Sequence, residues 1–134
     1  MVEVEYAHLC DFAFPGENGK PCVIGIFDVI NVVDFPAVYD RFQIAVQLRG
    51  APHEEVNGRI EVGRPNGEVL ATVPVPPLTM STEGGAFLQV AVVNLGFPEQ
   101  GRYVVKVISG ARTLVSKSLQ LRRHQQGPAL PVAH

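Results

Sequence analysis

Alternation of apolar and polar residues dominates this chain and predicts strands almost throughout. In residues 41–49 one face is fully apolar and the other mostly polar: Phe42, Ile44, Val46 and Leu48 against Arg41, Gln43, Ala45, Gln47 and Arg49. Successive side chains of a strand point to opposite faces, so we expect the first set to face the core and the second to face water. Long segments with a helical period are missing from the sequence, and we therefore expect very little helix.

The N-terminal segment alternates in the same way and predicts a strand with one buried face. That face would carry Val2, Val4, Tyr6, His8, Cys10 and Phe12, with Glu3, Glu5, Ala7, Leu9 and Asp11 on the opposite face. Residues 15–21 then concentrate Gly, Pro and Asn, which favour tight turns. We therefore expect a hairpin centred near Gly16, in which the next segment returns along the first strand.

Residues 22–33 are apolar on both faces, unlike the first segment. Such a run fits a central strand that is covered twice, or a strand that bends and gives its second half to another sheet. The pattern leaves both arrangements open. Phe35-Pro36 should end the run, because proline has no N–H to donate to a strand ladder.

Five later segments complete the predicted fold. They are residues 59–62, 69–75, 87–93, 103–108 and 113–121. Together they bring the total to about eight strands at intervals of roughly 8–12 residues, which is typical of a two-sheet sandwich. The sequence therefore predicts an all-β, single-domain, antiparallel β-sandwich over residues 1–121, with a closed barrel as the alternative. Residues 122–134 have no period and are predicted to be a flexible C-terminal tail, in which Leu130 and Val132 are candidates for contact with another subunit.

One local motif favours an immunoglobulin-like sandwich. Tyr103 follows Gly101 by two residues and the apolar Leu95 by eight. This spacing resembles a tyrosine corner, in which the phenol hydroxyl bonds to upstream backbone as the penultimate strand begins. The sequence has no Trp, and its two Cys do not bracket the sandwich, so the other marks of antibody domains are missing.

Composition and charge narrow the functional classes. With 134 residues, 46% of them hydrophobic and 18% charged, the chain is long and apolar enough for one core and is not of the disordered class. A net charge of −2 offers no electrostatic attraction for nucleic acid or an anionic membrane. No signal-peptide pattern begins the sequence, and its longest apolar stretch is shorter than the ~20 residues that span a bilayer. We expect a cytoplasmic protein with neither a nucleic-acid nor a membrane partner.

His8, Cys10 and Cys22 form the one group of residues with metal-ligating side chains. His8 and Cys10 alternate onto one face, and a hairpin centred near Gly16 would bring Cys22 opposite Cys10, so three zinc ligands could meet. Paired Cys-x2-Cys knuckles are missing, however, and we therefore favour packing in the core for all three. The same geometry would allow a Cys10–Cys22 disulfide, although a cytosolic location favours free thiols. We expect no bound cofactor.

The remaining candidate residues favour association over catalysis. The four Ser lie outside any Gly-x-Ser-x-Gly elbow, and no phosphate-binding loop is present. Four apolar residues fall on predicted outer faces and are interface candidates: Phe87, Val93, Val104 and Ile108. We therefore interpret the chain as a non-catalytic binding or assembly module, not an enzyme, whose partner is a second copy or another protein. The alternative is a small metal-binding protein or enzyme centred on His8, Cys10 and Cys22.

Two stretches of the chain also carry a family resemblance. The first joins Leu9-Cys10-Asp11 through the Gly/Asn turn to Ile24-Gly25-Ile26-Phe27-Asp28, and the second joins Gly101-x-Tyr103 through a hairpin to Leu119-x-Leu121. They resemble an uncharacterised family of small bacterial β-sandwich proteins over residues 4–121. The resemblance implies the sandwich fold, and it implies no activity.

Overall fold

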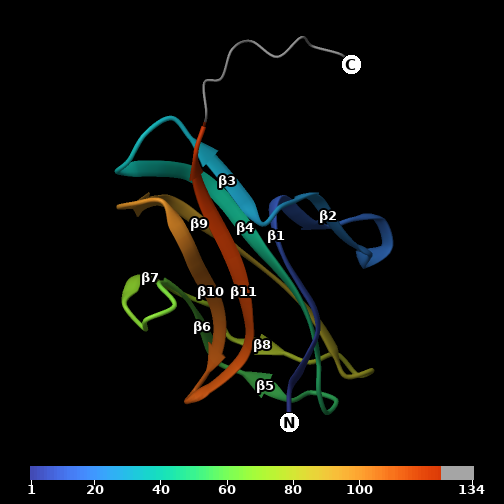
Figure 1. The fold of residues 1–134 in the computed structure, drawn as a ribbon. Helices are drawn as coiled ribbons and strands as arrows, with labels where there is room; N and C mark the ends of the chain where they lie inside the picture. The colour runs from blue at the N-terminus through green and yellow to red at the C-terminus, as the bar shows by residue number, and fades with distance from the viewer. Residues whose placement is uncertain (125–134) are drawn as a thin grey trace.

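Two sheets pack face to face in the computed structural model, which describes residues 1–124 (Figure 1). The first has the order β2-β1-β4-β9 and contains β1 (Glu3–Pro15), β2 (Pro21–Ile26), β4 (Ala37–Arg49) and β9 (Gly85–Phe97). The second has the order β3-β11-β10-β6-β7 and contains β3 (Val29–Val32), β6 (Gly58–Gly63), β7 (Val69–Pro74), β10 (Gly101–Ser109) and β11 (Arg112–Arg123). Two separate sheets of this kind confirm the predicted all-β sandwich.

The described residues form eleven strands, not about eight. Two of the additional strands, β5 (Glu55–Val56) and β8 (Leu78–Thr79), form a short pair of their own. The third arises because the run of residues 22–33 is divided: β2 belongs to the first sheet and β3 to the second. The structure thus shows the second of the two arrangements that the sequence left open, a run that bends and gives its second half to the other sheet. Helix within residues 1–124 is limited to one 3-10 turn, Glu17–Gly19.

The expectation of purely antiparallel sheets is wrong at one place. β3 pairs with β11 in parallel, with Val29 opposite Gln120 and Val32 opposite Arg123. The cause is the crossing of the chain from one sheet to the other at Phe27 and Asp28, after which β3 runs in the same direction as β11. The backbone N–H of Gln120 donates to the carbonyl of Asp28 at 2.8 Å and extends this pairing to the crossing itself.

The main core lies between the two sheets. The predicted inner face of β4 is confirmed, because Phe42, Ile44, Val46 and Leu48 are all at most 1% exposed. Leu88, Val90 and Val92 of β9 are buried with them, as predicted. The facing sheet contributes buried side chains from β6, β10 and β11: Ile60, Val62, Tyr103, Val105, Val107, Leu119 and Leu121. Burial of a large apolar side chain stabilises the fold by about 1.5–3 kcal/mol, so this cluster holds the sandwich together.

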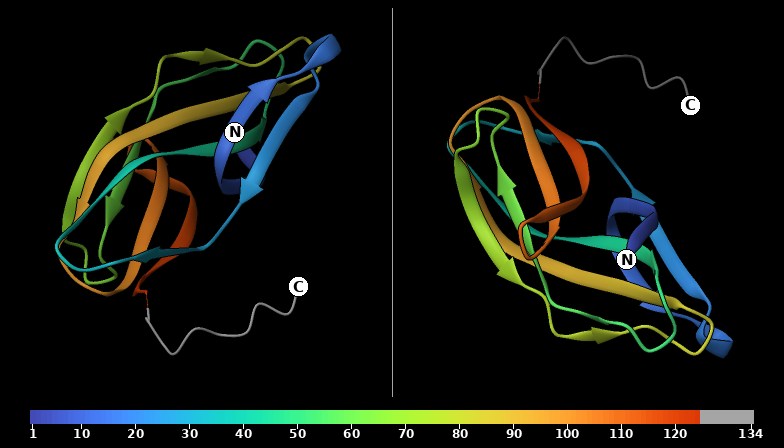
Figure 2. Two further views of the ribbon diagram at one scale, coloured as in Figure 1. Left: turned by 90° about the horizontal axis from the view of Figure 1, so that it is seen from above. Right: turned by 90° about the horizontal axis from the view of Figure 1, so that it is seen from below.

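The outer face of β4 departs from the prediction. Ala45 is fully buried and Gln43 is 8% exposed, although both were expected to face water. The far part of the β1–β2 hairpin causes this, because β1 leaves β4 after Cys10 and folds over the outer face of the first sheet (Figure 2). The Gln43 side-chain oxygen accepts a hydrogen bond from the backbone N–H of Ala13 at 2.5 Å and fastens the hairpin there.

The predicted buried face of the first strand is also wrong beyond its first residues. The register of β1 against β4 shifts between Val4 and Tyr6. A shift of one residue exchanges the two faces of a strand, so Ala7 and Leu9 point into the core and Phe12 is 53% exposed.

The tyrosine corner is confirmed. The Tyr103 hydroxyl donates to the carbonyl of Glu99 at 2.5 Å and accepts from the N–H of Glu99 at 3.3 Å, while the ring is only 1% exposed. The ring packs edge-on against Phe97, with 5.0 Å between centroids. This motif fixes the turn before β10, as in other immunoglobulin-like sandwiches.

The C-terminal strand is longer than predicted. β11 continues to Arg123 rather than ending at residue 121. The predicted tail contacts at Leu130 and Val132 lie outside the described residues and stay predictions. Within residues 1–124, no helix has the length and apolar character needed to cross a membrane.

Candidate functional site

The candidate cluster of three metal ligands, His8, Cys10 and Cys22, does not form. In the β1–β2 register Cys10 lies opposite Ile26, and Cys22 lies opposite Phe14, so the two thiols are at different levels of the hairpin and both are free. The hairpin is centred on Asn18 rather than Gly16, because its tip contains the 3-10 turn, and this moves the register by four residues. Across residues 1–124, no group of three or more His, Cys, Asp or Glu side chains is placed to hold a metal ion.

Cys10 has a packing role instead. It is 0% exposed and forms a small second cluster with Ala13 and Ala45 on the outer face of the first sheet, with Val23 and Phe87 at its margin. Burial raises the pKa of the Cys10 thiol, and the neighbouring Asp11 carboxylate adds to this increase. A buried thiol with a raised pKa is a poor nucleophile and a poor metal ligand. The alternative of an enzyme or metal site centred on these residues therefore loses its geometric basis.

The four interface candidates do not share a surface. Phe87 is half-buried at the margin of the second cluster, and Val93 of the same strand is 57% exposed. Val104 lies on the second sheet and is half-buried. Ile108 is only 6% exposed, so its prediction as a surface residue is wrong, although it does not belong to the main core cluster. Val93 alone of the four offers an exposed large side chain.

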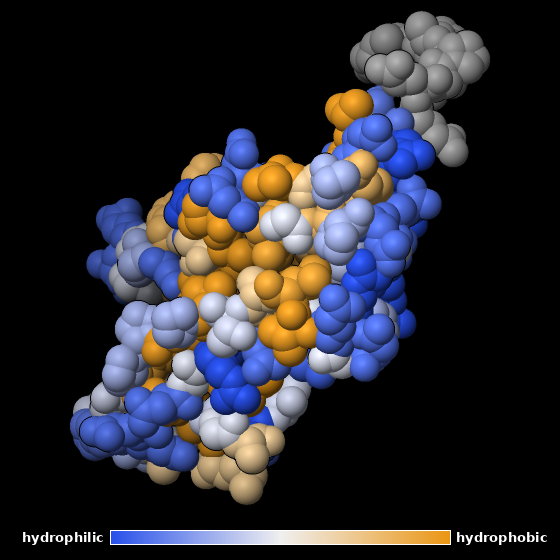
Figure 3. Space-filling view, turned by 90° about the vertical axis from the view of Figure 1, so that its left-hand side faces the viewer, coloured by the Kyte–Doolittle hydropathy of each residue, from blue (hydrophilic) through white to orange (hydrophobic). Residues whose placement is uncertain are grey.

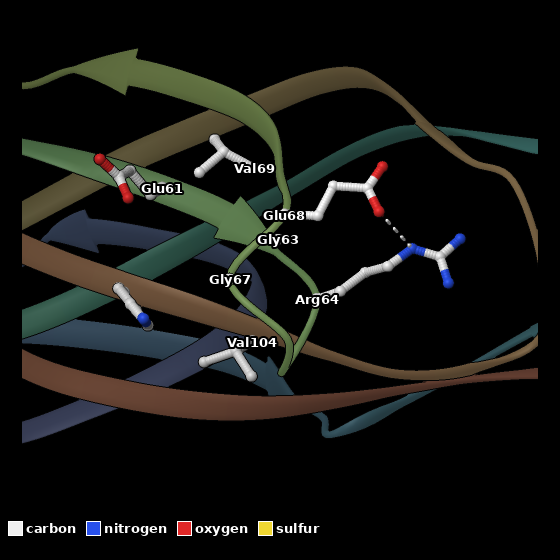
Figure 4. Close-up of a pocket in the computed structure, with 8 residues that line it drawn as sticks. Glu61, Gly63, Arg64, Gly67, Glu68, Val69 and Val104 are labelled. Carbon is white, nitrogen blue, oxygen red and sulfur yellow. Dashed lines mark ion pairs between the residues drawn. The ribbon is translucent and has the colours of Figure 1, made fainter.

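Val104 borders a small cavity beside the β6–β7 turn (Figure 4). The cavity measures about 30 Å³, which is room for about one water molecule. Arg64 extends from this turn toward Glu68, with 3.5 Å between Nε and Oε2, and also pairs with Glu99. The hydrogen bond to Glu99 raises the pKa of Arg64 above its ordinary value. The guanidinium carbon lies 5.5 Å from the Tyr103 ring centroid, so Arg64 packs on the tyrosine corner and stabilises it. The cavity itself is too small for a ligand.

The largest group of exposed apolar side chains lies on the β1–β2 hairpin. We call this surface the hairpin face; it consists of Phe12, Phe14, Ile24 and Ile26, which are 53%, 42%, 52% and 58% exposed. Phe12 and Ile24 are directly opposite in the register, so their side chains adjoin. Alternation along the first strand predicted Phe12 in the core, so this surface was not expected from the sequence. The two-sided apolar character of residues 22–33 was the signal that could have found it.

A cation and a further apolar residue extend the hairpin face. The guanidinium carbon of Arg41 lies 5.7 Å from the centroid of the Phe12 ring, which is a cation–π distance. In the register of β4 against β9, Arg41 lies directly opposite Val93, so both side chains are on the outer face of the first sheet. The hairpin face therefore continues through Arg41 to Val93.

Apolar side chains also gather on the side of the molecule that carries β7 (Figure 3). In this strand Val69 is 51% exposed, whereas Leu70, Ala71 and Val73 pack partly against the main core. The apolar side chains of β7 are thus partly buried against the core and partly exposed at the surface.

Comparison with known proteins supports the fold and an uncharacterised family. No curated protein matches the chain in sequence. An immunoglobulin-like protein from Pseudomonas aeruginosa superimposes with a TM-score of 0.50 at 14% identity, covering 91% of this chain and 97% of that one. The alkylpurine DNA glycosylase AlkC from Pseudomonas fluorescens gives a TM-score of 0.55 at 14% identity, with 90% of this chain covered and 30% of that one. For a GH3 β-glucosidase from Bifidobacterium adolescentis the TM-score is 0.52 at 12% identity, over 98% of this chain and 18% of that one.

These likenesses show the sandwich alone, since the identities are low and the chain spans about a third or less of the two enzymes. A family model supplies the closer assignment, because it matches residues 5–122, nearly the span of the resemblance noted in the sequence. The chain belongs to the family described as "Family of unknown function (DUF6941)".

Proposed function

We propose that this chain is a non-catalytic assembly module that binds a second copy or another protein through the hairpin face. One observation carries the proposal: four large apolar side chains lie together on the hairpin, each between 42% and 58% exposed. Single exposed apolar residues are common on protein surfaces, whereas a group of adjacent ones is typical of a protein–protein contact. Removal of such surface from water stabilises a complex by roughly 25 cal/mol per Å².

None of these four side chains belongs to either buried apolar cluster of the described residues. The opposite side of the hairpin, with Ala13 and Val23, packs against Cys10 and Ala45 and attaches the hairpin to the first sheet. The hairpin face is therefore held in position while it points away from the protein. Among the strands of residues 1–124, β2 is also an edge strand of its sheet. Unpaired backbone groups at an edge add hydrogen-bonding capacity to an apolar contact.

The chemistry of the surface favours a protein as the partner. Arg41 at the margin of the hairpin face is a residue type enriched at protein–protein contacts. A net charge of −2 gives no comparable attraction for nucleic acid or an anionic membrane. The separation of His8, Cys10 and Cys22 supports a non-catalytic role. We further propose that the protein acts in the cytoplasm, where its two free thiols would stay reduced.

A site-specific photo-cross-linker tests this proposal. Phe14 is replaced by p-benzoylphenylalanine, the cells that naturally produce the protein are irradiated, and covalent adducts are identified by mass spectrometry. Val69, which is 51% exposed on β7, receives the same group as the matched control. We expect a discrete adduct from position 14 that disappears when Ile24→Ser is added. Adducts no more abundant at position 14 than at position 69 would contradict the proposal.

A further inference from the structure

A cavity lies at the open end of the β1–β2 hairpin, which we call its root, where the chain crosses from the first sheet to the second after Ile26. This open cavity measures about 370 Å³ and is lined by Asp11 of β1, Tyr39 of β4 and six residues around the crossing: Gly25, Ile26, Phe27, Val29, Ile30 and Asn31. This volume falls within the range of small-molecule sites, roughly 300–1,000 Å³. The cavity is separate from the four outward side chains of the hairpin face except at Ile26, which borders both.

The lining of this cavity combines polar groups with aliphatic and aromatic side chains. Ile26, Val29 and Ile30 supply aliphatic surface, and Phe27 and Tyr39 supply two rings whose centroids are 6.5 Å apart. Both rings also contact Phe42, which is fully buried in the main core, at 6.0 and 6.2 Å between centroids. The aromatic wall is therefore fixed by the core and does not depend on a ligand for its position.

One carboxylate enters the cavity beside these rings. Asp11 lies opposite Gly25 in the hairpin, since the pairs on either side are Cys10 with Ile26 and Phe12 with Ile24. Gly25 has a φ of +73°, and the Asp11 carboxylate occupies the space that a side chain at position 25 would need. Asp11 makes no ion pair within residues 1–124. A glycine in left-handed conformation thus makes room for an acidic group without a cationic partner in the described chain.

The electrostatic environment of the cavity is negative. Burial raises the pKa of Tyr39, and the carboxylates of Asp11 and then Asp40 raise it further. No Lys, Arg or His belongs to the lining. The neighbouring cavity across the crossing differs, because Lys117 and His8 line it together with Asp28. The two cavities therefore favour different ligands, and only the first combines aromatic faces with negative charge alone.

The geometry points to a binding site for an alkylammonium ion in this first cavity. The positive group would lie beside the Asp11 carboxylate and against the faces of Phe27 and Tyr39, and its carbon chain would lie along Ile26 and Val29. Aromatic faces and a carboxylate both attract an organic cation, and apolar walls bind its alkyl part. A divalent metal ion fits less well, because calcium requires six to eight oxygen ligands and this cavity offers one carboxylate.

Titration with a matched pair of small probes tests the site. The full chain, labelled with ¹⁵N, is titrated with n-butylammonium chloride at constant chloride concentration, and with n-butanol as the uncharged counterpart. We expect saturable amide shifts at Asp11, Gly25, Phe27, Asn31 and Tyr39, with affinity for the ammonium at least about threefold higher than for the alcohol, the scale of an exposed charge contact. Equal affinity for the two probes, or shifts elsewhere only, would overturn the inference without the need for any variant.

Two pairs of variants then identify the groups responsible. Asp11→Asn should weaken n-butylammonium binding about three- to fivefold, whereas Asp28→Asn, at the neighbouring cavity, should leave it unchanged. Tyr39→Leu should weaken binding and Tyr39→Phe should retain it, because the phenylalanine ring keeps the aromatic face. A loss at Asp28→Asn as large as at Asp11→Asn would assign the effect to net charge and reject the site. None of these results depends on whether the hairpin face binds a partner.

Discussion

Two hairpins of this protein use their apolar residues in opposite ways. The β10–β11 hairpin points Tyr103, Val105, Leu119 and Leu121 into the main core, and each of these side chains is at most 1% exposed. The β1–β2 hairpin has equally strong apolar character, yet Phe12, Phe14, Ile24 and Ile26 remain on its outer side. Alternation along a strand therefore shows which face is apolar, and the tertiary structure decides whether another layer covers it.

The difference follows from where each hairpin lies. β10 is paired on both sides, by β6 and β11, and faces the first sheet across the core. β1 is paired with β4 only as far as Cys10 and then carries β2 over the outer face, where no further sheet exists among the described residues. A hairpin in that position can bury one side alone. Its other side is available to a different molecule, which is the basis of the proposed function.

Substitution of one phenylalanine from each region gives the largest expected contrast. Phe42→Ala in the main core should lower the free energy of unfolding by about 3–5 kcal/mol, because it leaves a cavity in a fully buried site. Phe12→Ala on the hairpin face should cost less than about 1 kcal/mol, since that side chain is 53% exposed. Denaturant-induced unfolding measures both values. Similar losses for the two variants would show that the hairpin face belongs to the core.

The tyrosine corner gives the next largest effect. Tyr103→Phe should lower the free energy of unfolding by about 1–2 kcal/mol, because the carbonyl and N–H of Glu99 lose their hydrogen-bond partner. Tyr6→Phe is the control, as the Tyr6 hydroxyl makes no hydrogen bond within residues 1–124, and its stability should stay near that of the parent protein. A stable Tyr103→Phe protein would mean that ring packing against Phe97 alone fixes this corner.

Gly25 tests the root of the hairpin. Gly25→Ala should destabilise the protein by about 1–2 kcal/mol, because alanine is strained at a φ of +73° and its methyl group would displace Asp11. Gly96→Ala, at a glycine with open space and no left-handed φ, should have little effect on thermal unfolding. If both variants unfold at the same temperature, the backbone at Gly25 is free to relax and the position of Asp11 is not fixed.

The two thiols give the smallest effect. Cys22 is half-buried and should react with Ellman's reagent in the folded protein, whereas Cys10 should react only on unfolding. The raised pKa of Cys10 also has a consequence for stability. Its contribution is present below the ordinary thiol pKa of 9.0 and is lost as the pH rises through the higher folded value. Stability at alkaline pH should therefore fall less steeply for Cys10→Ala than for the parent, and identical slopes would argue against a buried, protonated thiol.

Much of the main core could be predicted from the sequence. The β4 and β9 inner faces and the tyrosine corner all follow from local pattern, because strict alternation over several residues allows only one register against the core. The wrong predictions concern the faces of β1 and β4, and they arise from bulges and tertiary contacts, which the local pattern of apolar and polar residues does not indicate. The register shift between Val4 and Tyr6 exchanged the faces of β1, and the far part of the β1–β2 hairpin covered Gln43 and Ala45 on the outer face of β4.

The candidate sites were harder to predict than the core. The length of the hairpin tip, set by the turn Glu17–Gly19, decided that Cys22 would lie opposite Phe14 rather than Cys10. The hairpin face and the cavity at its root depend on β1 leaving β4 after Cys10, which is a tertiary event. The sequence did contain one indication, since residues 22–33 had more apolar positions than a single strand of one sheet could bury.

The parallel pairing of β3 with β11 also bears on how the chain folds. About ninety residues separate Val29 from Gln120, and a contact between such distant residues carries a large loop-closure entropy. β11 follows the other described strands along the chain, so β3 cannot pair in its sheet until β11 has left the ribosome. We therefore expect β3 to dock late, and folding to be slow, in the millisecond-to-second range of sandwiches with many non-local pairings. Until then β3 and the crossing segment would remain exposed on the nascent chain, at the stage when chaperones encounter it.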